Sequence, residues 1–207
     1  ALIVFVLSSL FSSSASSTKL SLKLWSKEFV INLSHLENIL TISSLFIISI
    51  SDDNGNVISE SMAICRYFDA IQPEPYLFGE TPEEKGLVEM WNRKIEIEGM
   101  NPVADCLRNS SEAFKDRAVP DPRATKQIPE LAERGSMLAN RFLGDINERL
   151  SKNKYVAGEN FSMSDINLYV FLDFASWVKV IPTDEHTDLL RWKDLINTRE
   201  SSKVFES

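Results

Sequence analysis

Histidine, cysteine and glycine are scarce in this chain of 207 residues. It contains two histidines, two cysteines and seven glycines. A zinc site draws several Cys or His ligands from short, regular spacings, and His35, His186, Cys65 and Cys106 stand apart from one another. We therefore expect no metal site. The cysteines form no CxxC pair and indicate no disulfide framework, which favours a cytoplasmic protein.

The chain also lacks an excess of basic charge. Its 22 Lys and Arg are outnumbered by 30 Asp and Glu, which gives a net charge of −8. Without a basic patch, we expect no nucleic-acid partner. The opening ALIVFVLSSLF is too short to span a bilayer, so we expect no membrane partner either. It has the apolar character of a signal-peptide core, but no basic segment precedes it and no convincing cleavage site follows.

The composition changes abruptly near residue 50. Residues 1–50 contain no glycine, no proline and no aspartate, and runs such as SSLFSSSASS are strongly biased. We interpret residues 1–50 as an aberrant or low-complexity segment and expect it to be irregular, because no strand–helix–strand rhythm is visible. From Ser51 onward the chain gains turn residues, acids and helix caps.

Helical signals dominate residues 82–207. Thr81, Pro82 and Glu84 have the spacing of an N-cap, a first helical residue and a capping box. A second capping signature, Ser162 to Asp165, precedes a long apolar run. We predict an all-α bundle of at least four helices over residues 82–200, with breaks near Pro102 and residues 119–122 and 152–161.

A short α/β element precedes this bundle. Asn54-Gly55 is a turn signal between two strands, and a helix follows with four apolar residues on one face: Ile64, Tyr67, Phe68 and Ile71. Its first turn carries Glu60 and Ser61 side by side. A helix N-terminus binds anions, and a neighbouring carboxylate attracts cations, so this pair could hold the head of an amino acid. Alternatively, Ser59 or Ser61 is a plain N-cap.

Three stretches resemble the cytosolic glutathione transferases: DDNGNVISESMAICRYFD, PEPYLFGETPEEKGLVEMWNRKIE and YVAGENFSMSDINLYVFLDFA. The resemblance covers about residues 51–207. It implies an α+β remnant followed by an all-α domain. Residues 51–78 would end a truncated or altered thioredoxin-like domain, and residues 82–207 would be the helical C-terminal domain. By the same resemblance, Glu60 and Ser61 would hold the γ-glutamyl head of glutathione.

The resemblance also implies a function, a cytoplasmic homodimeric transferase. It would conjugate the thiolate of glutathione, its co-substrate, to a hydrophobic electrophile. The family's catalytic Ser, Tyr or Cys and its Val-Pro pair are not recognisable in residues 1–50, which contain no proline and no tyrosine. Ile42-Ser43-Ser44 stands where Val-Pro would be, so we assign no catalytic residue. The alternative is a non-catalytic binding or assembly module with the same fold.

Two further positions could belong to a site. Cys65 lies one turn beyond Ser61 and is either a redox thiol or a small buried residue. Trp91 and Arg93 lie on the helix that, by resemblance, lines the pocket for the hydrophobic substrate. Their plain interpretation is a core aromatic and a solvated charge.

Overall fold

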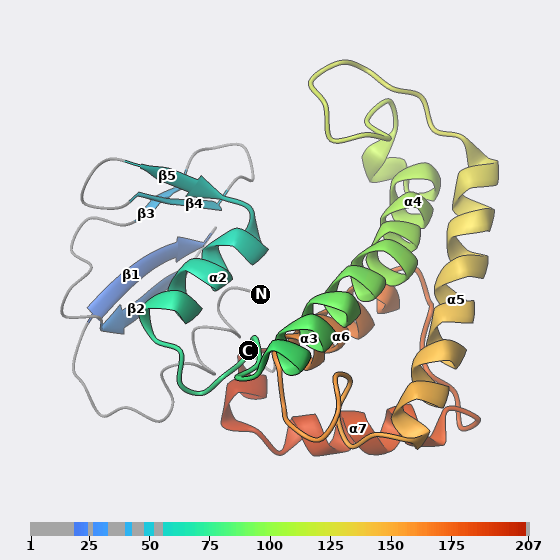
Figure 1. The fold of residues 1–207 in the computed structure, drawn as a ribbon. Coiled ribbons are helices and arrows are strands. Elements are labelled where there is room, and N and C mark those ends of the chain that lie inside the picture. The colour runs from blue at the N-terminus through green and yellow to red at the C-terminus, as the bar shows by residue number, and fades with distance from the viewer. Residues whose placement is uncertain (1–18, 25–26, 33–39, 43–47, 52–55, 206–207) are drawn as a thin grey trace. The chain divides into compact units, whose positions relative to one another are not determined.

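The computed structural model describes residues 19–24, 27–32, 40–42, 48–51 and 56–205. The chain divides into two compact units, residues 1–75 and residues 76–207 (Figure 1). Each unit has its own secondary structure, strands and one helix in the first and helices in the second.

Two antiparallel sheets and a helix make up the described part of unit 1. Strand β1 (Lys19–Leu24) pairs with β2 (Lys27–Asn32). The second sheet has the order β3 (Leu40–Ile42), β4 (Ile48–Ser51), β5 (Val57–Ser59). The predicted strand pair around Asn54-Gly55 is confirmed, since Ile50 of β4 lies opposite Ile58 of β5. The turn itself, residues 52–55, lies outside the described residues.

The expectation that residues 1–50 are irregular is wrong for the described strands. The β1 sequence KLSLKL alternates apolar and polar residues, which is the period of a strand, and its partner KEFVIN contains two β-branched residues. The strong serine bias around these segments obscured that alternation. The described residues before Ser51 contain strands only.

Helix α2 (Ser61–Ile71) follows β5 directly. Ile64, Cys65 and Phe68 are buried along one side of this helix. The predicted apolar face is wrong at Ile71, which is 56% exposed in the last turn of α2. The helix ends before Pro73, as predicted, because proline disfavours helical geometry in the residue before it.

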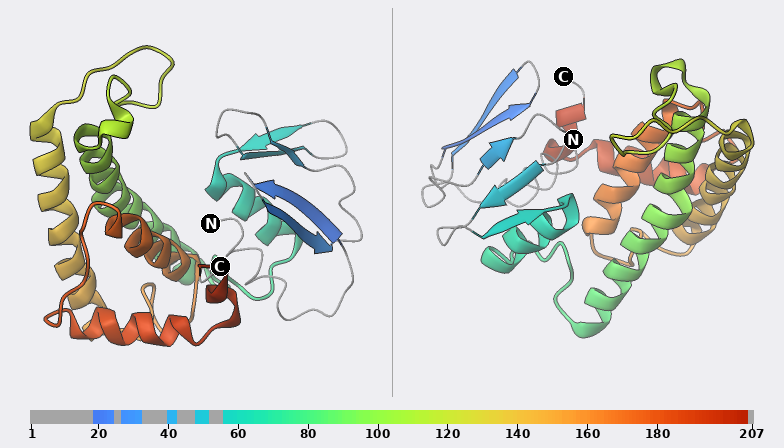
Figure 2. Two further views of the ribbon diagram at one scale, coloured as in Figure 1. Left: turned by 180° about the vertical axis from the view of Figure 1, so that it is seen from behind. Right: turned by 90° about the horizontal axis from the view of Figure 1, so that it is seen from above.

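Unit 2 is a helical bundle (Figures 1 and 2). Its described part contains α3 (Pro82–Lys94), a π-helical segment (Ile95–Met100), α4 (Asn101–Ser110), α5 (Pro129–Ser151), α6 (Met163–Ser176) and α7 (Thr187–Asn197). Short 3₁₀ turns cover Glu112–Phe114 and Glu200–Phe205. These five α-helices confirm the predicted bundle, and the chain is non-helical at residues 119–122 and 152–161, as predicted.

The interruption predicted near Pro102 is wrong: the chain stays helical there and only the helix type changes. Pro102 has no N–H to donate to the residue four positions earlier, and the segment just before it, Ile95–Met100, is π-helical. Helical geometry therefore continues from α3 into α4 with a local change of register.

The core of unit 2 lies where these helices approach closely. Phe142 of α5 and Phe171 of α6 meet edge to face at 5.3 Å between ring centroids. A Cβ on Gly99 would lie 2.8 Å from the Phe142 ring, so a larger residue does not fit there. Figure 2 shows α4 and α5 side by side, and Gly135 of α5 sits against the backbone of α4. Every helix in the described part of the chain is too short or too polar to cross a membrane.

Candidate functional site

The candidate site begins at the junction of β5 and α2. Glu60 is the N-cap residue of α2 and Ser61 is its first helical residue. The Glu60 carbonyl accepts the first helical hydrogen bond, from the Ile64 N–H at 3.0 Å. Its backbone has φ 71° and ψ 125°, a conformation that residues other than glycine rarely adopt. Strain of this kind is held where the surrounding structure imposes it, often at functional sites.

The side chains of Glu60 and Ser61 differ in exposure. Glu60 is exposed and Ser61 is half-buried, and Glu60 makes no side-chain capping hydrogen bond within the described residues. The alternative that Ser59 or Ser61 is a plain N-cap is wrong, because Glu60 occupies that position. The arrangement offers a carboxylate for a cation beside a hydroxyl and helix N–H groups for an anion.

Cys65 lies on the buried side of α2. Its side chain is buried, and burial raises the pKa of the thiol to about 12. At neutral pH the sulfur is therefore protonated and a poor nucleophile. The interpretation as a small buried residue is confirmed.

Trp91 and Arg93 have different environments. Trp91 is buried, and its ring lies beneath Arg149 of α5, with 5.0 Å from the guanidinium carbon to the ring centroid. Arg93 is exposed and pairs with Glu96 of the adjoining π-helical segment. Both therefore fit the plain interpretation of a core aromatic and a solvated charge.

The Ser162–Asp165 signature is an extensive buried network. Asp165 Oδ2 accepts hydrogen bonds from the Ser162 N–H and hydroxyl, at 2.9 and 3.1 Å. Its Oδ1 accepts from the Val156 N–H at 3.0 Å and from the Trp192 indole N–H at 2.8 Å. Burial raises the pKa of this carboxyl to about 6, against the effect of these hydrogen bonds. The network joins the start of α6 to α7 and to the preceding loop.

Sequence reasoning missed the contacts between cations and aromatic rings in unit 2. The Arg199 guanidinium carbon lies 3.6 Å from the Phe161 ring centroid, and Arg149 covers Trp91. These residues are far apart in the sequence, and no local motif links them.

The expected catalytic segment falls largely on residues that are not described. Ile42 ends strand β3, whereas Ser43, Ser44 and residues 1–18 lie outside the described residues. The catalytic group therefore stays unassigned. Across the described residues, His, Cys, Asp and Glu side chains form no group of three or more that could hold a metal ion.

The chain is similar to proteins of one known family. The family profile described as "Glutathione S-transferase, C-terminal domain" matches residues 110–200. A protein of Saccharomyces cerevisiae named Glutathione S-transferase 2 is 32% identical over 154 residues, which are 73% of this chain and 63% of that protein. The chain thus spans less than two thirds of this curated relative.

The chain is also similar to solved structures of glutathione S-transferases. The crystal structure of Gtt2 from Saccharomyces cerevisiae superposes with a TM-score of 0.68 at 31% identity, covering 75% of this chain and 73% of that one. A glutathione S-transferase of class Gtt2 from Vibrio parahaemolyticus has a TM-score of 0.68 at 23% identity, covering 97% and 88%. This second likeness supports the fold alone.

Proposed function

Because this chain belongs to the glutathione S-transferase family, we propose that it binds glutathione through Glu60 and Ser61 and conjugates it to an electrophile. The observation that carries this proposal is the polar pair at the start of α2. Glu60 and Ser61 are adjacent, accessible and held on a helix whose other side is buried.

The chemistry of the pair suits the γ-glutamyl head of glutathione, which carries an ammonium and a carboxylate on one carbon. The carboxylate would accept hydrogen bonds from the Ser61 hydroxyl and N–H, reinforced by the helix dipole. The ammonium would pair with Glu60. The unusual backbone of Glu60 turns the chain from β5 into α2 at this point, which brings both groups to the same helix end.

The reaction we propose is attack of the glutathione thiolate on a hydrophobic electrophile. A thiol with an ordinary pKa of about 8.5 is only a few per cent thiolate at neutral pH, so a group that lowers this pKa accelerates the reaction. A second candidate is a non-catalytic module that keeps the glutathione site. The observation that favours it is the absence of any proline or tyrosine from residues 1–50.

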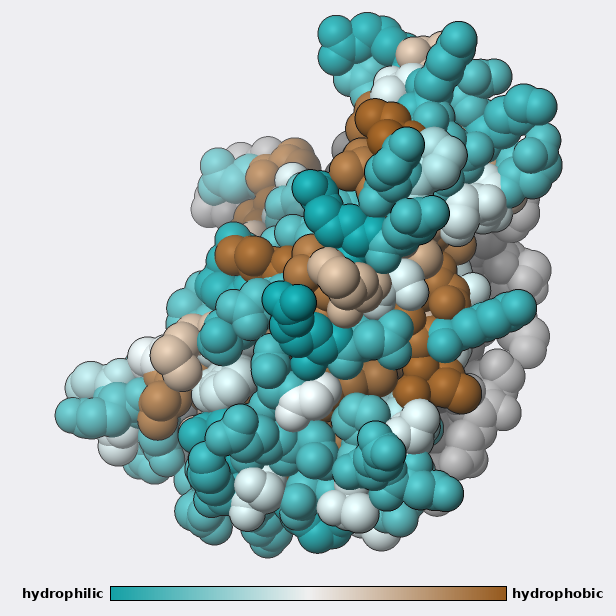
Figure 3. Space-filling view, turned by 90° about the vertical axis from the view of Figure 1, so that its right-hand side faces the viewer, coloured by the Kyte–Doolittle hydropathy of each residue, from teal (hydrophilic) through white to brown (hydrophobic). Residues whose placement is uncertain are grey.

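We further propose a cytoplasmic homodimer. Both cysteines are free and buried, which fits a reducing compartment. A groove of about 280 Å³ between the π-helical segment and α5 is lined by four apolar residues, Ile97, Pro102, Leu138 and Phe142, and by three charged ones, Glu98, Arg141 and Asp145. Ile97 is 51% exposed, and Figure 3 shows hydrophobic residues at the surface on the α5 side.

A second copy suits this groove because its charges are self-complementary. Glu98, the third charged residue of the groove, pairs with Lys94 at 3.0 Å, whereas Arg141 and Asp145 take part in none of the ion pairs of the described residues. A two-fold contact can place Arg141 of each copy against Asp145 of the other. Sedimentation analysis tests this: Ile97→Glu should yield monomers, whereas Ile181→Glu, at a position 56% exposed elsewhere, should not.

Calorimetric titration with glutathione tests the binding site. Ser61→Ala should weaken affinity about tenfold or more, because a hydrogen bond to a charged group contributes roughly 1.5–3 kcal/mol. Ser59→Ala, which removes an exposed hydroxyl two residues earlier, is the matched control. Equal affinity in the wild type and Ser61→Ala would refute the assignment.

A conjugation assay with an activated aryl halide separates the two candidates. Turnover that rises with glutathione and falls in Ser61→Ala supports the transferase. Binding without turnover supports the non-catalytic module.

A further inference from the structure

Two cations contact aromatic rings around the loop between α5 and α6. Arg199, just beyond α7, stacks on Phe161. The Lys154 ammonium lies 5.3 Å from the centre of the Tyr155 ring. Tyr155 and Phe161 meet edge to face at 5.9 Å. The four side chains form one connected group, which we call the 154–199 cluster.

The charge of Arg199 has no carboxylate partner within the described part of the chain. Its Nε is buried and forms no hydrogen bond there. Asp165 interacts with it electrostatically, but both oxygens of that carboxylate already accept hydrogen bonds from other groups. A half-buried guanidinium normally has an acceptor, because desolvating an unpaired charge is unfavourable.

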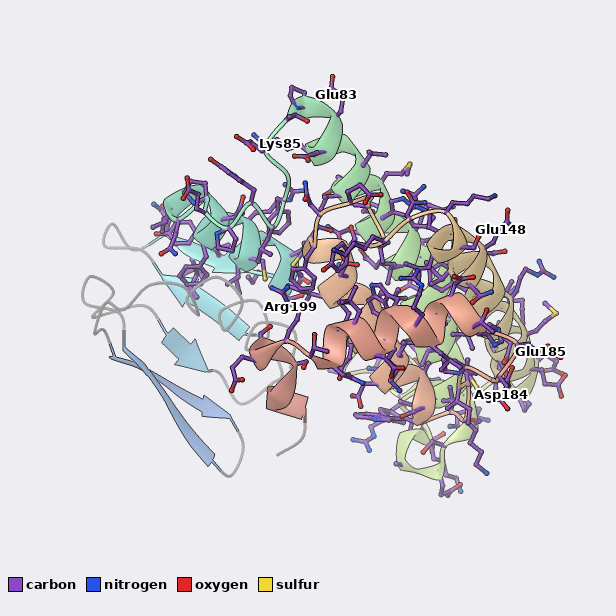
Figure 4. The ribbon with its side chains drawn as sticks, turned by 90° about the horizontal axis from the view of Figure 1, so that it is seen from below. Glu83, Lys85, Glu148, Asp184, Glu185 and Arg199 are labelled. Atoms are coloured by element: carbon purple, nitrogen blue, oxygen red, sulfur yellow. The ribbon has the colours of Figure 1, made fainter. Side chains whose placement is uncertain are left out.

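The acids that precede α7, Asp184 and Glu185, are too distant to pair with Arg199. Figure 4 shows Arg199 at one end of α7 and Asp184 and Glu185 at the other. Helix α7 has eleven residues, about 16 Å of helix at 1.5 Å per residue. Asp184 and Glu185 therefore do not pair with Arg199.

We propose that the 154–199 cluster is a binding site for a small oxyanion, a carboxylate or phosphate group, held by Arg199 and the Tyr155 hydroxyl. The proposal goes beyond glutathione binding, because none of these residues belongs to the Glu60–Ser61 pair. It assigns a ligand to a guanidinium whose buried Nε forms no hydrogen bond within the described chain.

Geometry supports the proposal. Stacking on Phe161 fixes the plane of the guanidinium, so its terminal nitrogens are pre-oriented for a planar or tetrahedral oxyanion. Tyr155 is half-buried, and its ring contacts the Phe161 ring on which Arg199 stacks, so its hydroxyl donor belongs to the same cluster. Lys154 adds a second positive charge at the exposed side. Burial lowers the pKa of the Arg199 guanidinium, and an anion would oppose that shift.

The opposing interpretation is that stacking on Phe161 is the whole role of Arg199. Cation–π contacts stabilise folded proteins without any ligand. The two interpretations differ in one measurable respect: a ligand site responds to oxyanions and not to chloride at the same ionic strength.

Arginine side-chain NMR on the full chain provides the test. The Arg199 Nε–H resonance, assigned by its loss in Arg199→Lys, should shift saturably with inorganic phosphate or with acetate. Chloride at matched ionic strength should leave it unchanged. The separate phosphate and acetate titrations identify which oxyanion the site prefers. The Arg123 resonance is the internal control, because that exposed group is already paired with Asp121.

Thermal unfolding supplies a second readout that includes the variants. The preferred oxyanion should raise the melting temperature of the wild type. Arg199→Lys should bind about tenfold more weakly, because lysine lacks the planar fork. Tyr155→Phe, which removes only a hydroxyl, should bind several-fold more weakly, and it serves as the test variant if Arg199→Lys does not fold.

Two results would overturn the proposal. One is the absence of a saturable shift at Arg199 with both phosphate and acetate. The other is equal oxyanion affinity in the wild type, Arg199→Lys and Tyr155→Phe. Since neither measurement uses glutathione, failure here leaves the proposed glutathione site unaffected.

Discussion

Replacing Asp165 by alanine should destabilise unit 2 more than any other single loss of a cap. The Asp165 carboxylate accepts four hydrogen bonds from three residues. Val156, Ser162 and Trp192 are all buried, so water cannot take the place of the lost acceptor. The substitution therefore leaves two backbone N–H groups and an indole N–H without partners.

The magnitude follows from these three donors. Each buried donor that loses its partner costs about 1–3 kcal/mol. Desolvation of the carboxylate offsets part of the loss, and a net cost of about 4 kcal/mol results. Ser162→Ala removes a single hydroxyl donor and should cost about 1 kcal/mol. At about 3 °C per kcal/mol for a chain of this size, the melting temperature should fall by about 12 °C and 3 °C respectively.

Thermal and denaturant unfolding at pH 7 measure both variants. Asp173→Ala, an exposed acid on the same helix, is the matched control. A melting temperature for Asp165→Ala within 2 °C of that control would refute the reasoning. It would mean that the bundle does not depend on this network.

Three other predictions concern pH, helix packing and backbone strain. Burial raises the pKa of Asp165 to about 6 from its ordinary 3.8, so the folded state favours the protonated carboxyl. The free energy of folding that this preference contributes is complete below pH 3.8 and is lost as pH rises through 6. The unfolding free energy of the wild type relative to Asp165→Asn should therefore be about 1.4 kcal/mol lower at pH 7.5 than at pH 5. A Cβ on Gly135 would lie 2.4 Å from the Pro102 carbonyl oxygen, so Gly135→Ala should cost about 2 kcal/mol or more in denaturant unfolding. Gly144→Ala, on the same helix with open space around it, should instead stabilise by up to about 1 kcal/mol. Glycine accepts φ 71° without strain, so Glu60→Gly should be about 1 kcal/mol more stable than Glu60→Ala. Calorimetry should find weakened glutathione binding in both variants.

The helix boundaries of unit 2 were predictable because their signals are local. Thr81 and Glu84 are three residues apart, and the structure shows both bonds of the capping box: the Glu84 N–H donates to the Thr81 hydroxyl at 3.2 Å, and Glu84 accepts from the Thr81 N–H at 3.3 Å. Proline positions are equally local, since Pro102 alters the helix whatever packs against it. Such features need no knowledge of tertiary contacts.

The strands of unit 1 were harder to predict. The pattern KLSLKL has the period of a strand, but strand formation also needs a partner, and the register of β1 on β2 is a tertiary property. The biased composition of the flanking residues hid a signal that the alternation itself carries.

For the candidate site, too, the local features could be predicted from the sequence and the tertiary ones could not. The residue types of Glu60 and Ser61 and their place at a helix start were visible in the sequence. The positive φ of Glu60 was not, because local preference opposes it and only the junction of β5 with α2 imposes it. The stacking of Arg199 on Phe161 was also hidden, because it depends on the fold of the whole bundle.

The two proposed sites depend on different parts of the fold. Glu60 and Ser61 are positioned by β5 and by the buried side of α2, both within unit 1. The 154–199 cluster is positioned by the loop before α6 and the end of α7, both within unit 2. A substitution that disturbs one unit need not disturb the other. Loss of glutathione binding with retained oxyanion binding would therefore place a defect in unit 1, and the converse would place it in the bundle.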